Sequence, residues 1–322
     1  MIQKEREFPL AIQLLEILLS RLAPNHPKKP DIEKELAKRW LGYRGEQNLD
    51  YHLHFIPEKQ YTILHNLRLT NNEKYYFQMD TLLLHQNFLL IIEAKNIMGK
   101  LLFEGNHNQL IRNMKDHDEA FQDPITQVKN QQFQLASWLQ SKKLPSIPID
   151  HLIVISNDSS IIQTQSISTY NKHRIIHAPL LKERIESIRS QYKQEVLNQK
   201  VLKKITKLLI SEHTPLTMDF LQKFNLSNST IRNGVRCPNC NSIPMERAHS
   251  TWLCHSCGTT NKNAHIEAIY EYFSLIKPFI TNQEARKFLL LSSKDTASRL
   301  LKGMNLPSTG SYRDKKYFPL GK

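Results

Sequence analysis

The sequence predicts an α/β protein whose main sheet is mixed and flanked by helices, followed by a small cysteine-containing module and a basic helical C-terminus. Three observations lead to this fold class. A predicted helix, three strands, a second helix and a further strand follow one another in residues 31–156. All four cysteines of the 322-residue chain fall in two C-x-x-C pairs. The net charge is +14, and residues 201–322 carry +10 of it.

The N-terminal segment, residues 1–30, predicts one amphipathic helix. Its apolar stretch at residues 8–22 is interrupted by Gln13, Glu16 and Arg21, and no run of eighteen apolar residues occurs in the chain. We therefore expect a surface helix and neither a signal peptide nor a membrane anchor. The expected location is the cytoplasm.

A second helix is predicted over residues 31–54, with Leu36, Trp40 and Leu49 on its apolar side. Within it, Gly45 costs about 1 kcal/mol relative to alanine, which predicts a close approach by another segment. Short aliphatic runs separated by turn residues then predict three successive strands, and two shorter strands are expected between residues 99 and 113. The three strands cover residues 62–69, 76–85 and 88–95.

The next helix has a well-marked start. Asp123 can cap it and Pro124 suits the first helical position, and we expect the helix to end near residue 140. An apolar strand at residues 149–156, a strand at 173–177 and one long helix from 179 to 211 are predicted to follow. These elements describe a layered α/β domain in residues 31–180, followed by a helical linker in residues 181–235.

The turn at residues 86–87 sets the register of the second and third strands. In a symmetric hairpin the paired residue numbers sum to 173, which places Asp80 opposite Glu93 and Gln78 opposite Lys95 on one face. A bulge would slip the register and put the two carboxylates on opposite faces. Opposed carboxylates on a half-buried sheet call for a compensating cation. Mg²⁺ prefers such oxygens, and Lys95 could orient or help deprotonate an attacking water.

Four short motifs now resemble, in order, those of the nuclease-related domain (NERD) family. That family belongs to the restriction-endonuclease-like folds with a D...ExK signature, and the resemblance covers residues 40–140. The motifs are Gly42-Tyr-Arg-Gly-Glu46, Gln78-Met-Asp80, Glu93-Ala-Lys95 and Gln127 on the following helix.

The resemblance implies a role for each matching residue. Asp80 and Glu93 would be ligands of Mg²⁺ or Mn²⁺, Lys95 the catalytic lysine, and Glu46 and Gln127 polar residues that reach the site from the two helices. The implied activity is hydrolysis of phosphodiester bonds, in DNA more readily than in RNA, and a homodimer would place two sites across a duplex. The alternative is a non-catalytic nucleic-acid-binding protein that uses the same sheet as a platform. The intact set of site residues favours the nuclease.

The cysteine spacing predicts one tetrahedral structural Zn²⁺ in residues 236–262, with a hairpin around Trp252. Iron would also suit four thiolates. Two disulfides are the alternative, which the absence of a secretion signal disfavours. The segment resembles the zinc ribbon often found after nuclease-related domains, which commonly contacts nucleic acid. The ligands would be Cys237, Cys240, Cys254 and Cys257.

The C-terminal segment, residues 263–322, predicts two short helices around Ser292-Ser293 and then a basic hairpin at residues 310–318. This order is typical of a winged-helix-like module, and the alternative is a helical unit with a solvated basic face. The charge favours nucleic acid over a membrane, because no basic amphipathic helix carries a Trp or Phe face. Salt-sensitive phosphate contacts are expected from Lys294, Arg299, Lys302, Arg313, Lys315 and Lys316.

Overall fold

The computed structural model describes residues 1–57, 60–71, 74–114 and 117–320. The chain forms two compact units, each built from two separate stretches. The first unit consists of residues 1–8 and 40–217. The second consists of residues 9–39 and 218–322.

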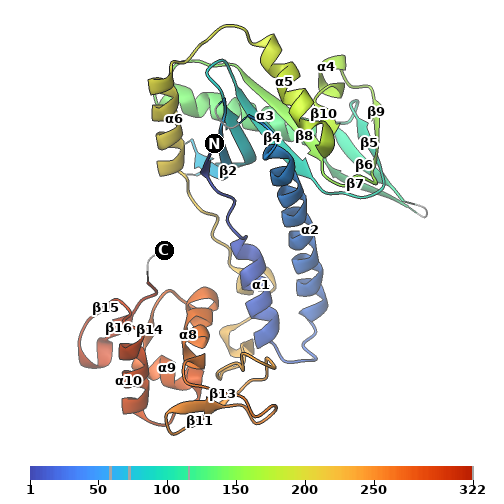
Figure 1. Cartoon of the computed structure of the whole chain (residues 1–322). Helices are drawn as coiled ribbons and strands as arrows, with labels where there is room; N and C mark the ends of the chain where they lie inside the picture. The colour runs from blue at the N-terminus through green and yellow to red at the C-terminus, as the bar shows by residue number, and fades with distance from the viewer. Residues whose placement is uncertain (58–59, 72–73, 115–116, 321–322) are drawn as a thin grey trace. The chain divides into compact units, whose positions relative to one another are not determined.

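A six-stranded mixed sheet in the order β1-β2-β3-β4-β8-β10 forms the centre of the first unit (Figure 1). β2, β3 and β4 are antiparallel neighbours, whereas β1 with β2, β4 with β8 and β8 with β10 run parallel. The predicted mixed sheet and its predicted strands are confirmed, and β1 was not predicted. The strands are β1 (Ile2–Lys4), β2 (Thr62–Thr70), β3 (Tyr76–Leu84), β4 (Leu89–Lys95), β8 (Ile149–Ile155) and β10 (Ile175–His177).

Helices cover both faces of this sheet. α3 (Pro124–Ser141) and α6 (Gln199–Ser211) share one apolar cluster with it, while α5 (Leu181–Gln191) and the C-terminal part of α2 (Lys29–Leu53) share another. The sheet is therefore the middle of three layers. As predicted, Asp123 caps α3, because its carboxylate accepts hydrogen bonds from the N–H groups of the first turn.

The prediction of one long helix over residues 179–211 is wrong. The chain forms α5 and α6 instead, because each helix covers a different face of the sheet and the chain must cross from one face to the other. In the crossing, the backbone N–H groups of Val196 and Leu197 donate to the carbonyl oxygen of Gln86, at 3.1 and 2.9 Å.

A second sheet of four strands, in the order β7-β6-β5-β9, adjoins the first. Its apolar side packs against the start of α3 and against β8. The two strands predicted between residues 99 and 113 are confirmed as β5 and β6. Its strands are β5 (Lys100–Glu104), β6 (Gln109–Asn113), β7 (Asp118–Gln122) and β9 (Ile161–Gln165), and the short helices α4 (Thr169–Lys172) and η1 (Ala178–Leu180) follow.

The predicted N-terminal helix is found as α1 (Leu10–Arg21), and it belongs to the second unit. Its buried side joins one apolar cluster with the C-terminal elements. The buried guanidinium of Arg21 donates through Nε to Oε2 of Glu271, at 2.6 Å. Neither α1 nor any other helix in the described ranges has the length and apolar character that a bilayer crossing requires.

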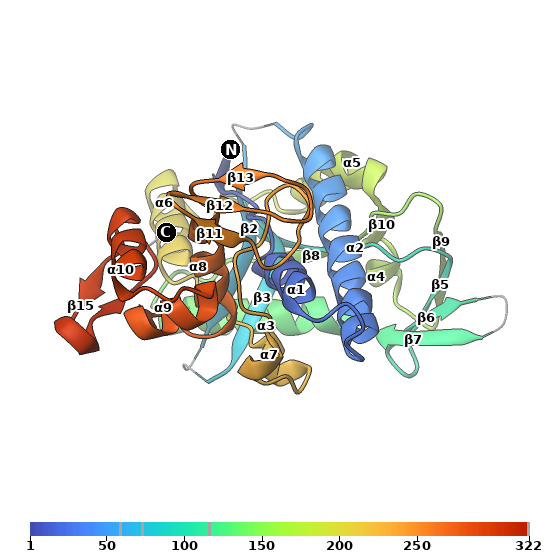
Figure 2. The same cartoon turned by 90° about the horizontal axis from the view of Figure 1, so that it is seen from below.

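The C-terminal elements of the second unit are two small sheets and a set of short helices (Figure 2). The two predicted short helices are confirmed as α9 and α10, and α10 begins at Lys294. The sheet strands are β11 (Glu246–Ala248), β12 (Thr251–Leu253) and β13 (Thr260–Asn261), then β14 (Ile280–Thr281), β15 (Ser308–Thr309) and β16 (Lys316–Tyr317). The helices are α7 (Phe220–Lys223), η2 (Asn228–Thr230), α8 (Ala264–Leu275), α9 (Asn282–Leu289), α10 (Lys294–Gly303) and η3 (Tyr312–Asp314).

Candidate functional site

Strands β3 and β4 separate at the point where the predicted acidic residues lie. Four residue pairs whose numbers sum to 173 join the strands, which confirms the predicted register. The last of them is Thr81 with Ile92, one pair short of Asp80 and Glu93. Beside Asp80, Asn66 of β2 has a φ of +49°, so the sheet is irregular at this level.

The direct pairing predicted for Asp80 with Glu93, and for Gln78 with Lys95, is therefore not formed in the described ladder. Gln78 pairs with β2 instead, and its side chain is exposed. Asp80 reaches across the gap, where its Oδ2 accepts a hydrogen bond from the backbone N–H of Ala94 at 3.1 Å. Where a backbone pair of Asp80 with Glu93 was predicted, the side-chain carboxylate of Asp80 instead makes the hydrogen bond to β4.

The carboxylates of Glu93 and Glu46 act electrostatically on Asp80. Burial, and then the carboxylates of Glu93 and Glu46, raise the pKa of Asp80 well above its usual value. The Lys95 ammonium and the Ala94 N–H offset only part of this effect. The structure therefore brings these predicted site residues together and leaves Asp80 in an excess of negative charge.

Glu93 is held by a closed set of hydrogen bonds. Lys95 Nζ donates to Oε1 of Glu93 at 2.7 Å and to Oε1 of Gln127 at 2.9 Å, and Gln127 Nε2 donates to the same Glu93 oxygen at 2.6 Å. Burial lowers the pKa of Lys95, but the Glu93 and Asp80 carboxylates outweigh it and raise that pKa overall. Lys95 therefore carries its proton.

Gln131 is a site residue that sequence reasoning missed. Gln131 lies on α3 and is 4% exposed. Its Nε2 donates to Oε2 of Glu93 at 3.0 Å and to the carbonyl oxygen of Gln78 at 2.9 Å. The signal that could have found it is its spacing of four residues from Gln127, which puts both amides on one side of α3.

Glu46 is bound by an arginine that the sequence did not single out. Arg6, 4% exposed, donates through Nη1 to Oε2 of Glu46 at 2.6 Å. Its Nε and Nη2 donate to the two carboxylate oxygens of Asp50, at 2.6 and 2.9 Å. Burial nevertheless raises the pKa of Glu46, because the Arg6 charge offsets it only in part. Forty residues separate Arg6 from Glu46, so only the fold reveals the pair.

The close approach predicted at Gly45 is confirmed. A Cβ atom at this position would lie 2.6 Å from Cβ of Asn96 and 2.8 Å from Oγ of Ser156. Glycine lets α2 come this close to the end of β4, and Glu46 is thereby carried to the site.

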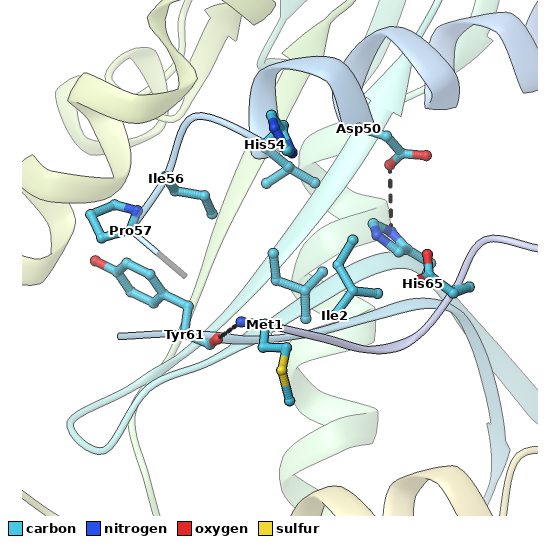
Figure 3. Close-up of a pocket in the computed structure, with 11 residues that line it drawn as sticks. Met1, Ile2, Asp50, His54, Ile56, Pro57, Tyr61 and His65 are labelled. Carbon is cyan, nitrogen blue, oxygen red and sulfur yellow. Dashed lines mark hydrogen bonds and ion pairs between the residues drawn. The ribbon is translucent and has the colours of Figure 1, made fainter. Parts of the chain in front are cut away.

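A cavity of about 260 Å³ lies beside the Arg6 network (Figure 3). Asp50 and His65 reach it from α2 and β2, with Nδ1 of His65 3.5 Å from Oδ1 of Asp50. Burial lowers the pKa of His65 to about 4, so this imidazole is neutral at neutral pH. The remaining lining is mainly apolar and includes Met1, Ile2, Leu53, Ile56, Pro57, Tyr61 and Ile63.

The four cysteines gather as predicted. Their Sγ atoms all lie within 4.8 Å of one another, and none is in a disulfide. The donor set therefore fits one metal ion, as in a zinc ribbon. Within the described ranges, no other group of three or more His, Cys, Asp or Glu side chains converges in this way, so Asp80, Glu93 and Glu46 offer a more open arrangement.

The predicted basic residues lie on α10 and on the hairpin of β15 and β16. Lys294, Arg299, Lys302 and Lys316 are exposed, and Lys315 is half-buried. The hairpin pairs residues 308–309 with 316–317, so it is wider than predicted. The side chain of Arg313 lies outside the described part of the structure. The second unit as a whole carries +10 of the net charge of +14.

Comparison with protein families finds a match within the first unit. No curated protein and no solved structure matches the chain. The family model described as nuclease-related domain (NERD) matches residues 41–156, from α2 to the residue after β8. This segment contains Glu46, Asp80, Glu93, Lys95 and Gln127, whereas Arg6 and the cysteines lie outside it. Over residues 41–156 the chain therefore matches the nuclease-related domain family, as its motifs predicted.

Proposed function

We propose that this protein is a metal-dependent nuclease that hydrolyses phosphodiester bonds in DNA, more readily than in RNA. The observation that carries the proposal is the meeting of Asp80, Glu93 and a protonated Lys95 at the split between β3 and β4, within the matched segment. A charged lysine beside two carboxylates is an arrangement that suits phosphoryl chemistry.

Asp80 and Glu93 would hold Mg²⁺ or Mn²⁺. Their oxygens suit hard cations, which need only one or two protein carboxylates when waters and substrate phosphate complete the coordination. The raised pKa of Asp80 fits this assignment, because a cation would relieve the repulsion that causes it. When bound, the ion supplies Lewis-acid stabilisation and a more acidic water.

The chain's own residues have separate roles in this proposal. Lys95 is protonated, so it orients the attacking water and stabilises negative charge on the phosphate, and it does not take up the water's proton. Gln127 fixes the Lys95 ammonium, and Gln131 fixes the second oxygen of Glu93. The Glu46 carboxylate, which accepts a hydrogen bond from Arg6, adds a negative charge near Asp80.

The second unit would bind the substrate strand. The four cysteines would hold a structural Zn²⁺, and α9, α10 and the β15–β16 hairpin would act as a winged-helix-like module. The concentration of positive charge in this unit supports the proposal. We also propose a restriction-endonuclease-like fold for residues 31–180 and a homodimer that cleaves both strands of a duplex. A cytoplasmic location is proposed as well, because it suits four cysteines that form no disulfide.

One observation favours the second candidate, a non-catalytic nucleic-acid-binding protein. Lys95 already neutralises Glu93, so the site does not require a metal for that carboxylate. Such a protein would bind DNA equally well with and without Mg²⁺, whereas an active site would gain affinity from the ion.

The test is cleavage of supercoiled, linear and single-stranded DNA, and of RNA, with Mg²⁺, Mn²⁺ or neither. Asp80→Asn and Lys95→Met are compared with Asp158→Asn and Lys172→Met, which remove the same charges from exposed positions of the first unit. Metal-dependent cleavage that is lost only in the first two variants is expected. Absence of cleavage by the wild-type protein, or equal cleavage by all variants, would reject the nuclease.

A further inference from the structure

Asp80 lies at a gap in the described ladder on both sides of β3. Toward β4, the last pair before it is Thr81 with Ile92. Toward β2, the pair of Asn66 with Asp80 is omitted from a ladder that continues on either side of it. The φ of +49° at Asn66 lies in the left-handed region, which asparagine tolerates better than most residues. At this level the described ladder therefore gives Asp80 no partner on a neighbouring strand.

The guanidinium of Arg6 lies at this gap. Its Nη1 donates to Oδ1 of Asn66 at 2.9 Å and, at 3.4 Å, to the carbonyl oxygen of Asp80. Its Nη2 donates to Oγ1 of Thr81 at 3.0 Å. One side chain thus bridges β2 and β3 at the level where their backbone pair is missing.

The opposite edge of the guanidinium is anchored on α2. The two carboxylate oxygens of Asp50 accept hydrogen bonds from Nε and Nη2 of Arg6, at 2.6 and 2.9 Å. Nδ1 of the neutral His65, beside Asp50 in Figure 3, lies 3.0 Å from the same Nη2 and can accept its other proton. Two parallel hydrogen bonds fix the plane of an arginine, so Asp50 determines where Nη1 points.

Nη1 also contacts the acid that α2 brings to the site. It donates to Oε2 of Glu46 at 2.6 Å, so one nitrogen links Glu46, Asn66 and the main chain of Asp80. Together with the contacts to Asp50 and β3, these acceptors use every N–H of the guanidinium. The side chain is 4% exposed, and the single ammonium of a lysine could not serve both edges at once.

We propose that Arg6 is a positioning residue of the nuclease site, which holds the main chain of Asp80 and the carboxylate of Glu46 in place where the sheet does not. The inference rests on the proposed function, which it deepens. Arg6 acts through these two residues and touches neither the substrate nor the reacting atoms. It also precedes the segment matched by the family model, so the strand β1 that carries it toward the site completes the matched domain.

The test is the affinity of the full, zinc-loaded chain for Mn²⁺, measured by electron paramagnetic resonance of the free ion, together with kcat and KM for supercoiled DNA. Groups that orient metal ligands contribute about 10- to 100-fold to metal affinity or activity. Arg6→Gln should therefore weaken Mn²⁺ binding by about 10- to 100-fold and lower kcat. KM for DNA should stay unchanged, because Arg6 does not contact the strand.

Arg174→Gln is the matched control. Arg174 is 3% exposed, lies in the same unit, and donates through Nε and Nη2 to the carboxylate of Asp150, at 3.0 and 2.7 Å. Both substitutions break a buried two-point pair and should lower stability to a similar degree. Only Arg6→Gln should change the affinity for Mn²⁺.

Two further variants separate position from charge and from folding. Arg6→Lys keeps the charge, and it should not restore Mn²⁺ binding; full rescue would show that charge alone suffices and would overturn the inference. Asn66→Gly suits the left-handed backbone and removes only an acceptor of Nη1, so it should fold and bind Mn²⁺ more weakly than wild type.

Wild-type affinity in Arg6→Gln, or in Asn66→Gly if Arg6→Gln does not fold, would overturn the inference and leave the proposed function intact. An equal loss of affinity in Arg174→Gln would also overturn it, because the effect would then be one of stability. A wild-type protein that neither binds Mn²⁺ nor cleaves DNA would reject the proposed function and the inference with it.

Discussion

Asp80→Asn is expected to stabilise the metal-free protein. Asp80 is repelled by Glu93 and Glu46, and among the described residues its carboxylate accepts one hydrogen bond, from the N–H of Ala94. Asparagine keeps an oxygen for this hydrogen bond and removes the repelled charge. Close charged neighbours couple by about 0.5 to 3 kcal/mol, so we expect a gain of about 1 kcal/mol. In a unit of this size that gain raises Tm by about 2 to 4 °C.

The same substitution should abolish stabilisation by Mg²⁺. An ion that binds only the folded state adds about 2.7 kcal/mol at a hundred times its Kd, and the variant should lose this shift. The matched control is Asp50→Asn, whose carboxylate accepts two hydrogen bonds from Arg6 at 2.6 and 2.9 Å. This variant should lose about 2 kcal/mol, because charge-assisted hydrogen bonds are removed.

The assay is thermal unfolding over a Mg²⁺ titration in buffer without chelator, which leaves the cysteine site undisturbed. Opposite signs for Asp80→Asn and Asp50→Asn are the decisive result. A metal-free Asp80→Asn protein that is less stable than wild type, with an unchanged response to Mg²⁺, would refute the reasoning.

Three further outcomes concern the second unit. Burial lowers the pKa of His265 to about 4, below its unfolded value of about 6.5, so its stabilisation is complete above pH 6.5 and is lost as pH falls toward 4. Between about pH 7.5 and 5.5 the free energy of unfolding in urea should fall by about 1 kcal/mol, and His265→Asn should make it less dependent on pH. The same pH dependence in His265→Asn as in wild type would contradict the role of this histidine. Glu271→Gln leaves Arg21 and Arg236 without their shared acid and should cost about 3 to 5 kcal/mol in urea unfolding, so a loss below 1 kcal/mol would count against the buried pair. Cys254→Ser should remove zinc, measured by elemental analysis, and weaken only the unfolding transition of the second unit; retained zinc would rule out the four-cysteine assignment.

The parts of the fold that were predicted are those set by neighbouring residues. β2, β3 and β4 follow from aliphatic runs and turn residues, and the turn alone determines the register that β3 and β4 share. The Asp123 cap and the cysteine spacing are equally local. Glu93 and Lys95 were proposed as site residues on the same local basis, since they end a strand whose apolar pattern is clear, and the register of the hairpin added Asp80.

The parts that were missed depend on distant segments. β1 has three residues and becomes a strand only because β2 offers it a free edge, and Arg6 follows it into the site. The ladder of β3 and β4 stops at the level of Asn66, which lies on a different strand and has a φ of +49°. The helical pattern of residues 179–211 looked continuous, because the apolar periodicity does not indicate which face of the sheet each half of the segment covers.

The division of each unit between two stretches of chain governs how the protein can be made and cut. α1 leaves the ribosome long before α8, α9 and α10. Its apolar side therefore stays exposed to solvent until nearly the whole chain has been synthesised. A fragment limited to residues 41–156 would lack β1, Arg6, β10, α5 and α6, and a fragment of residues 218–322 would lack α1. Expression of the intact chain is therefore the route to either half in native form.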